Sequence, residues 1–371
     1  MKATRLVRII TSLSLAVVAL SAIAWLGLGQ VSGAINRIDV FSTLSKRPDK
    51  PTTSLNYLLV GSDTREGLTK AQSKVLRVGS TKSAAGARSD TMLLVHISKA
   101  RDKATIISLP RDSLVTIPEH QSSLYKDRTV AAGNGKLNSA FAWGGAPLLI
   151  QTIESETGVR VDHYVEIGFA GFAGMVDALG GIEVCTKKDI NDPQSHLTLS
   201  AGVHSLDGIE ALKYVRTRDF DGMGDLGRMQ RQQQFMSSVL RKVTSTGVLL
   251  NPVKLIKFFD AAIATVKTDS ELNSSDLLTL AKQLKNLSAS KVRTLTIPLS
   301  NANARVSGLG SVVIWDKVLA PDLFNRLRLD LPLIDEVTPS PSASSTATPA
   351  PIAVDKFKTR TADENPCGAL K

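Results

Sequence analysis

Three runs of apolar residues constrain the fold of this chain more than any other feature of its sequence. They occupy Leu55–Val60, Thr91–Ile97 and Ala104–Leu109, and they are apolar almost throughout. A strand with one face in water would alternate polar and apolar residues, so we expect a sheet that is covered on both faces. The polar stretch 98–103 between the second and third runs predicts a hairpin.

Helical patterns lie between and after these runs. Apolar residues at 146, 149, 150 and 153, and again at 169, 172, 173, 176 and 179, have the spacing of two helices that end near glycines. Further helices are expected over 205–215, 227–244, 252–266 and 275–287, and further strands over 182–184 and 292–297. Strands with interspersed helices predict an α/β fold, a three-layer α/β/α domain with a mixed central sheet.

The beginning of the chain predicts a membrane anchor. Residues 9–29 carry no charge and match the roughly 20 apolar residues that a helix needs to cross a bilayer. Lys2, Arg5 and Arg8 precede them, so residues 1–8 should stay in the cytoplasm while the rest is exported. A signal peptide cleaved near Ala24 is the alternative, but the apolar run continues past that point. We expect an uncleaved signal-anchor in the cell membrane, with the folded domain outside.

The other end of the chain predicts a tail. Residues 339–351 read PSPSASSTATPAP, a composition that cannot bury a core. We therefore expect a linker over 30–53, a folded domain over 54–335 and a tail over 336–371. The chain has two cysteines, and an exported protein is free to oxidise them. We expect Cys185 and Cys367 to form a disulfide that joins the tail to the strand ending at 185.

Composition narrows the class of function. Lys and Arg number 45 against 34 Asp and Glu, a net charge of +11, which suits an anionic partner. Two cysteines, and five histidines without H-E-x-x-H or H-x-E spacing, argue against a zinc enzyme. G-x-S-x-G and P-loop motifs are missing from the sequence. We expect no nucleic-acid partner, because the domain is exported and only 5% of residues are aromatic.

Four polar clusters lie at the ends of the predicted elements. They are Gly61–Arg65, Arg88–Thr91, Pro110–Asp112, and Arg216–Arg218 with the segment 224–234 that follows it. Ligands of α/β sheets usually bind at strand ends. Paired carboxylates there could hold Mg²⁺, and arginines could grip a diphosphate bidentately. A single cluster could equally consist of turn formers on a solvated face, but four together favour a phosphate site. The G-x-G-x-x-G match at 222–227 follows a charged run instead of a strand and does not predict dinucleotide binding.

Seven segments, in order, resemble one protein family. They read YLLVGSDTR, RSDTMLLVHI, ISLPRDSLVTIP, GKLNSAFAWGGA, TGVRVDHYVEIGFAGFAGMVDALGGIEV, GVHSLDGIEALKYVRTRD and GDLGRMQRQQQF. They closely resemble the LytR–CpsA–Psr family over about residues 54–245, and the cysteine pattern and Pro/Ser/Thr tail resemble its actinobacterial members. The resemblance implies a phosphotransferase that moves a glycopolymer from a polyprenyl diphosphate carrier to a peptidoglycan hydroxyl.

The resemblance also implies roles for particular residues. Asp63 and Asp90 are the expected Mg²⁺ ligands, and with Arg111 they form the expected catalytic group, in which either carboxylate could act as the base. The expected diphosphate-binding residues are Arg88, Arg111, Arg216, Arg218, Asp225, Arg228, Arg231 and Gln234. The prenyl chain should enter an apolar pocket between sheet and helices, with Phe169, Phe172 and Val176, or Phe235 and Val239, as candidate lining residues.

The sequence departs from the family pattern at two places, and three alternative functions stay open. Asp63 and Asp90 are separated by an insertion at 66–87, and Asp219 stands where the family often has histidine. The alternatives to transfer are hydrolysis of the carrier diphosphate at the same site, non-catalytic binding of envelope lipid or cell wall, and a regulatory role in the envelope. An intact Asp63/Asp90 pair favours an enzyme, because binding alone would not require a metal.

Overall fold

The structure is a computed structural model of the chain. It describes residues 36–78, 89–123, 125, 128–218, 222, 224–245, 266–273, 276, 279–280, 283–284, 287–337, 352–364 and 367. The predicted anchor 9–29 lies outside these residues, as do residues 252–265 of the predicted helix 252–266 and most of the predicted helix 275–287; Val266 instead begins strand β14 (Val266–Asp269). Within the described part of the chain, no helix combines the length and the apolar character needed to span a membrane.

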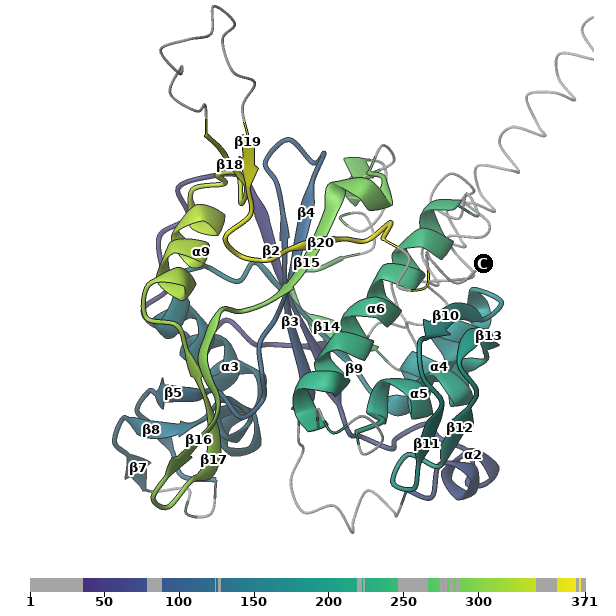
Figure 1. The fold of residues 1–371 in the computed structure, drawn as a ribbon. Helices are drawn as coiled ribbons and strands as arrows, with labels where there is room; N and C mark the ends of the chain where they lie inside the picture. The colour runs from purple at the N-terminus through teal and green to yellow at the C-terminus, as the bar shows by residue number, and fades with distance from the viewer. Residues whose placement is uncertain are drawn as a thin grey trace, which may run out of the picture.

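An eight-stranded mixed sheet forms the centre of the molecule (Figure 1). Its strands, in spatial order, are β1 (Asn36–Ile38), β14 (Val266–Asp269), β9 (His163–Ile167), β2 (Leu55–Ser62), β3 (Ser89–Ile97), β4 (Ala104–Ser108), β15 (Val292–Thr296) and β20 (Arg360–Thr361). The pairs β1/β14, β2/β9 and β4/β15 are parallel, and the other neighbours are antiparallel. The predicted mixed sheet and the β3–β4 hairpin are therefore confirmed.

Helices cover both faces of this sheet (Figure 1). One face carries α3 (Leu137–Thr157) and α9 (Leu319–Arg328), and the other carries α4 (Phe169–Ala178), α5 (Gly208–Arg216) and α6 (Gly224–Ser245). Alternate residues of β2 serve the two sides, since Leu58 and Val60 belong to the core under α3 while Leu59 packs on the side of α6. This two-sided burial explains why the strand sequences lack alternation.

The remaining elements are short. They are α2 (Lys70–Val75), the 3₁₀ turn η4 (Ala289–Lys291), and the hairpin pairs β5 (Leu114–Ile117) with β8 (Gly133–Lys136), β6 (His120–Gln121) with β7 (Thr129–Val130), β10 (Ile182–Thr186) with β13 (Gly202–Leu206), β11 (Ile190–Asp192) with β12 (Leu197–Leu199), β16 (Leu299–Val306) with β17 (Gly310–Trp315), and β18 (Asp335–Val337) with β19 (Ile352–Val354).

Two helix boundaries differ from the prediction for local reasons. The helix predicted over 145–157 is only the second part of α3. A further helical segment from Leu137 precedes it, and the two meet at a kink where Gly145 has φ 64°. The helix expected from 205 begins at Gly208, because Ser205 and Leu206 pair in β13. Asp207 caps α5: its carboxylate accepts from the Glu210 amide at 2.8 Å, which completes a capping box.

The folded domain extends beyond both of its predicted ends, residues 54 and 335. Residue 36 onward belongs to the fold, because β1 pairs with β14 and Val40 is buried in the main core. At the other end, β20 pairs with β15, and Ala362 is fully buried, with its amide donating to Val292 and its carbonyl oxygen accepting from Arg241 of α6. The described part of the segment 352–367 therefore completes the sheet instead of forming a detached tail.

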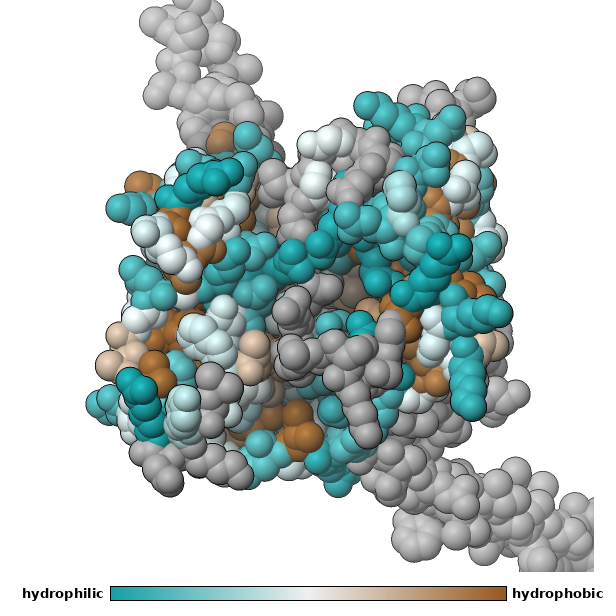
Figure 2. Space-filling model, turned by 90° about the horizontal axis from the view of Figure 1, so that it is seen from below, coloured by the Kyte–Doolittle hydropathy of each residue, from teal (hydrophilic) through white to brown (hydrophobic). Residues whose placement is uncertain are grey.

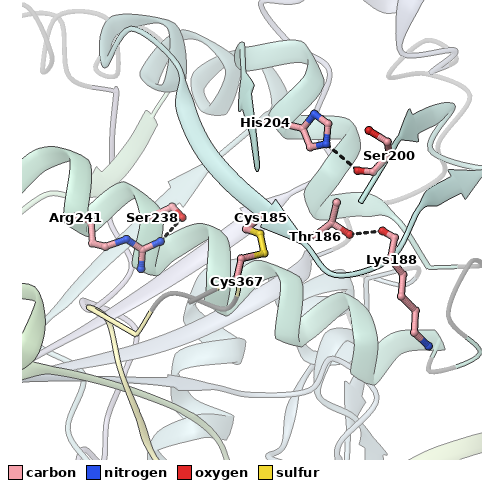
Figure 3. Close-up of a disulfide and its surroundings, with 8 residues drawn as sticks. All are labelled: Cys185, Thr186, Lys188, Ser200, His204, Ser238, Arg241 and Cys367. Carbon is pink, nitrogen blue, oxygen red and sulfur yellow. Dashed lines mark hydrogen bonds between the residues drawn. A yellow bond between two sulfur atoms is a disulfide. The ribbon is translucent and has the colours of Figure 1, made fainter. Parts of the chain in front are cut away.

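A disulfide joins Cys185 at the end of β10 to Cys367, the pairing that the sequence predicted. The two Cα atoms lie 5.9 Å apart, and both cysteines are buried. Figure 3 shows the bond beside α6, where an Nη2 of Arg241 donates to Ser238 at 2.7 Å. Nη1 of Arg241 donates to the carbonyl oxygen of Ala362 at 2.6 Å, so α6 also holds the segment that the disulfide anchors.

Candidate functional site

A cavity of about 530 Å³ lies between the sheet and the helices α4, α5 and α6. Its polar lining residues are Ser62, Asp63, Thr91, Arg111, Gln194, Ser195, Arg216, Arg218, Arg228 and Gln232. Its apolar lining residues are Leu59, Val60, Leu93, Ile167, Phe169, Phe172, Met175, Leu212, Val215, Phe235, Met236 and Val239, with Gly61 and Gly168 beside them. The charged side chains lining it number four arginines and one carboxylate among those that the structure describes.

Polarity changes along the walls of this cavity in one direction. On α6, Arg228 and Val239 lie about 16 Å apart at 1.5 Å of rise per residue. On β2, Leu59 and Asp63 lie about 13 Å apart along the strand. The carboxyl end of β2 and the start of α6 both lie at the lower end of the molecule in Figure 1. The cavity is thus cationic at that end and apolar further in.

The face at that end mixes the two kinds of surface. Figure 2 views the molecule from below and shows hydrophobic and hydrophilic residues next to one another on this face. Such a cavity fits a ligand with an anionic head and an apolar chain, because arginine forks match phosphate oxygens and the apolar walls replace water around a hydrocarbon.

Asp63 follows directly after β2, and a β-bulge in the neighbouring strand brings the backbone of Asp90 to the same place. Gly61 pairs with Thr91 and Ser62 pairs with Ser89, so Asp90 is the extra residue of the bulge. Bulges next to functional sites redirect a side chain out of the regular alternation of the strand. A Cβ at Gly61 would lie 3.1 Å from the Cβ of Thr91, so a glycine permits the close approach of these strands.

Four predicted arginines converge on the cavity from three different elements. Arg111 follows β4, Arg216 ends α5 and Arg228 lies in the first turns of α6. The guanidinium of Arg216 lies over the ring of Phe169 with 5.0 Å between its Cζ and the ring centroid, a cation–π contact that fixes the side chain at the apolar boundary. Nε of Arg111 donates to Asp112 at 3.3 Å, and Lys136 Nζ lies 3.0 Å from the same carboxylate.

Asp192 organises part of the lining, and sequence analysis did not identify it. Its Oδ1 accepts from the amides of Gln194 at 2.7 Å and Ser195 at 3.2 Å, and its Oδ2 accepts from the amide of Arg218 at 2.6 Å. The carboxylate is 1% exposed. It therefore joins the turn at residues 192–195 to the segment that carries Arg218. The signal was present as an Asp-Pro turn motif, but only the tertiary contact joins that turn to Arg218.

The α6 segment 228–234 divides between two faces of the helix. Arg228, Gln232, Phe235 and Val239 recur at helical spacing and line the cavity. Gln234 does not share that face: with Gln230, Ser237 and Arg241 it lines a separate polar cavity of about 400 Å³. Gln234 therefore lies outside the cavity that the arginines line, whereas Gln232 lines it, and the diphosphate-binding role of Gln234 stays a prediction.

Arg231 has a supporting position. It is 6% exposed, and its Nη2 donates to the carbonyl oxygen of Thr217 at 2.5 Å, so it ties α6 to the loop that carries Arg218. Gln232 Nε2 donates to the Val215 carbonyl oxygen at 3.2 Å in the same way. Burial raises the pKa of Tyr214 on α5 to about 12, against an opposing effect of Arg231, so this phenol stays neutral beneath the site.

The candidate apolar residues largely line the cavity as expected. Phe169, Phe172, Phe235 and Val239 are all on its wall, and the rings of Phe172 and Phe235 lie 5.2 Å apart. Val176 does not line the cavity and is fully buried in the hydrophobic cluster that also contains Phe235 and Val239. The side chains of Arg88, Asp90, Asp219 and Asp225 lie outside the described residues, as do residues 79–87 of the 66–87 insertion.

The residues present fit a magnesium ion held jointly by protein and substrate. Among described side chains, no group of three or more His, Cys, Asp or Glu gathers as a metal site. Mg²⁺ usually takes one or two carboxylates together with water and phosphate oxygens, instead of an all-protein cage. Asp63 in the cationic part of the cavity supplies one carboxylate of that kind among the described side chains.

Fold and cavity together define a three-layer α/β protein with one cavity that is partly cationic and partly apolar. Residues 31–323 match the LytR_cpsA_psr family model, and the chain belongs to the LytR_cpsA_psr family. It is 38% identical over 277 residues to the probable cell wall biosynthesis protein LcpB of Corynebacterium glutamicum, an alignment that covers 75% of this chain and 62% of that protein.

Two further relatives extend the comparison. The polyisoprenyl-teichoic acid–peptidoglycan teichoic acid transferase TagT of Bacillus subtilis is 33% identical over 238 residues, which are 62% of this chain and 63% of TagT. The chain thus spans less than two thirds of the length of these curated relatives. A solved structure of TagT bound to LIIa-WTA superposes with a TM-score of 0.59 and 26% identity, covering 80% of this chain and 99% of that one.

Proposed function

We propose that this protein transfers a glycopolymer, with its linking phosphate, from a polyprenyl diphosphate carrier to a peptidoglycan hydroxyl, forming a phosphodiester. The observation that carries the proposal is the single cavity in which four arginines and Asp63 pass into apolar walls. A polyprenyl diphosphate has this same division between a charged head and a hydrocarbon chain. Relatives named as teichoic acid transferases and cell wall biosynthesis proteins support the reaction class.

The arginines supply binding and electrostatic stabilisation. Arg111 follows β4, Arg216 ends α5 and Arg218 lies in the loop after α5, and all three line the cavity where the diphosphate would bind. Phosphoryl transfer requires mainly positioning and neutralisation of charge that spreads over the phosphate oxygens. Lysine could supply the charge but not the planar fork.

The proposed reaction balances as a displacement at phosphorus. The oxygen of the acceptor hydroxyl forms a bond to the phosphorus that bears the glycan, and the bond to the bridging oxygen breaks. The leaving group is polyprenyl monophosphate, which the arginines retain. The acceptor proton goes to a strand-end carboxylate, and Asp63 is the described candidate.

Mg²⁺ is part of the proposal as a partner of the diphosphate. When bound, it would be held by Asp63 and Asp90 and would neutralise charge on phosphate oxygens. Asp63→Asn should therefore abolish the Mg²⁺ dependence of farnesyl diphosphate binding in calorimetry while leaving the melting temperature unchanged. Equal Mg²⁺ dependence in the variant and the wild type would exclude this role for Asp63.

We further propose a single-pass location in the cell membrane, with the described domain outside. The uncharged run 9–29 and the three preceding basic residues support this arrangement, and so does the disulfide, which persists in oxidising compartments. A reporter enzyme that is active only outside the cytoplasm, fused after residue 371, should be active if this topology holds.

The product of the reaction tests the proposed function. The full-length protein in detergent would be incubated with glycan-loaded carrier lipid, Mg²⁺ and peptidoglycan fragments, and the products identified by mass spectrometry. Transfer predicts glycan joined to the fragment through phosphate, with polyprenyl monophosphate in equal amount. Free glycan phosphate with abundant acceptor present would identify a hydrolase, and unchanged carrier would identify a binding or regulatory protein.

A further inference from the structure

An exposed aromatic surface lies beside the cavity, on a segment to which the proposed reaction gives no role. It consists of His120 and Trp143, whose rings stack, and we call it the aromatic platform. Trp143 is 41% exposed. Large aromatic side chains contribute most of their free energy when buried, so an exposed group of them commonly marks an interaction site.

The platform is held in place before any ligand binds. The rings of His120 and Trp143 stack with 5.6 Å between their centroids and 12° between their planes. Nδ1 of His120 lies 2.8 Å from the carbonyl oxygen of Pro118, which fixes the imidazole. A Cβ at Gly135 in β8 would lie 2.6 Å from Ile117 Cδ1 and 3.7 Å from the indole, so this glycine lets the strand pass beneath Trp143.

Short links connect the platform to the cavity. Lys136 follows Gly135 and pairs with Asp112, the residue next to Arg111. The amide of Asn138 donates to the carbonyl oxygen of Arg111 at 2.9 Å, and Trp143 lies just over one helical turn further along α3. In Figure 1, β5, β7 and β8 lie at the lower end of the molecule, the end to which the cationic part of the cavity also belongs. A molecule reacting at Arg111 can therefore extend over the platform.

The chemistry of the platform suits a sugar chain. Its stacked π-faces match the C–H face of a pyranose ring, because the negative face of an aromatic ring attracts the slightly positive hydrogens. Neighbouring Lys136 and the exposed Arg128 add cations for carboxylates attached to such a chain. A hydrocarbon chain would instead need an enclosed groove, which the cavity already provides.

We propose that the aromatic platform binds the glycan strand of the acceptor, with Trp143 as the residue on which a sugar ring stacks. This inference rests on the proposed transfer to peptidoglycan, and it assigns the acceptor to the α3 side of Arg111, while the carrier occupies the cavity on the side of α6. According to this proposal, Trp143 binds the acceptor and takes no part in binding the carrier.

The test compares acceptor binding with carrier binding in the full-length protein. Co-sedimentation with insoluble peptidoglycan measures the first, and calorimetry with farnesyl diphosphate and Mg²⁺ measures the second. Trp143→Ala should weaken sedimentation at least tenfold and leave farnesyl diphosphate affinity unchanged, while Trp143→Phe should keep most of the binding. Leu331→Ala, which removes another exposed apolar side chain from the end of the chain segment after α9, is the matched control and should bind both ligands normally.

Each outcome has a definite meaning. Wild-type sedimentation by Trp143→Ala overturns the proposal, and so does a parallel loss of farnesyl diphosphate binding, which would show that Trp143 supports the cavity. Loss of binding to phospholipid vesicles without loss of peptidoglycan binding would identify a membrane contact and also overturn it. The two proposals can also separate. If neither the wild type nor any variant transfers glycan, but Trp143→Ala alone loses binding to peptidoglycan, the binding role of the platform is supported and the proposed transfer reaction is refuted.

Discussion

Removing the disulfide should cost a large part of the stability of this domain. The bond closes a loop of 182 residues between Cys185 and Cys367. In the chain-entropy model, a loop of that length reduces the freedom of the unfolded chain by about 5 kcal/mol, and native disulfides commonly contribute about 2–5 kcal/mol when measured. Because β20 and Arg241 also hold the C-terminal segment, we expect the double variant Cys185→Ser/Cys367→Ser to fold and to lose about 3–5 kcal/mol.

Urea denaturation of the full-length protein, followed by far-UV circular dichroism, measures this loss. Wild-type protein unfolded in the presence of a reductant serves as the matched control and should reproduce the midpoint of the double variant. Arg241→Gln, which removes the charged contact to the Ala362 carbonyl but keeps the disulfide, should cost less than the double variant. A loss below about 1 kcal/mol, or free thiols in unreduced unfolded protein, would refute the reasoning.

Three further perturbations test the site and the packing around it. Arg218→Lys should lower turnover about tenfold or more with little change in melting temperature, since a charged hydrogen bond contributes about 1.5–3 kcal/mol and lysine lacks the fork; wild-type turnover would show a solvated role. Gly208→Ala should destabilise by about 1–3 kcal/mol in urea, because a Cβ there would overlap the carbonyl of Ala173 where α5 crosses α4. Burial lowers the pKa of His96 despite its contact with Asp330 at 3.1 Å, so the folded state binds fewer protons than the unfolded chain, and stability should fall as the pH drops below about 6.5. His96→Gln should flatten that part of the pH profile, and an unchanged profile would assign it to other groups.

The predicted fold succeeded where burial on two faces leaves a direct mark on composition. The strands β2, β3 and β4 and the helix α4 were expected within a few residues of their positions. The edge strands β1 and β20 and the interior strand β14 were not, because they are only two to four residues long and too polar to stand out from loops. Their place in the sheet depends on neighbours that are distant in sequence, such as β14 for β1.

The candidate site, like the fold, was predicted from the sequence only in part. Asp63, Arg111, Arg216, Arg218 and Arg228 stand at recognisable ends of elements, and the structure brings them into one cavity. Their roles in binding and catalysis stay predictions. The contribution of Asp192 could not be inferred, because its carboxylate acts through a contact with the Arg218 amide 26 residues away.

The sequence by itself determined the layered α/β class, the pairing partners available to two lone cysteines, and the residue types of a phosphate site, because each depends on local pattern or on counting. Only the tertiary structure decided which side of a helix faces the ligand. Gln232 and Gln234 are chemically identical and two positions apart, yet at about 100° of rotation per residue one lines the arginine cavity and the other lines a different one. Helix orientation is set by packing against the sheet, where Gln233 donates to Ser108 and Thr296, and no local feature of the glutamine run carries that information.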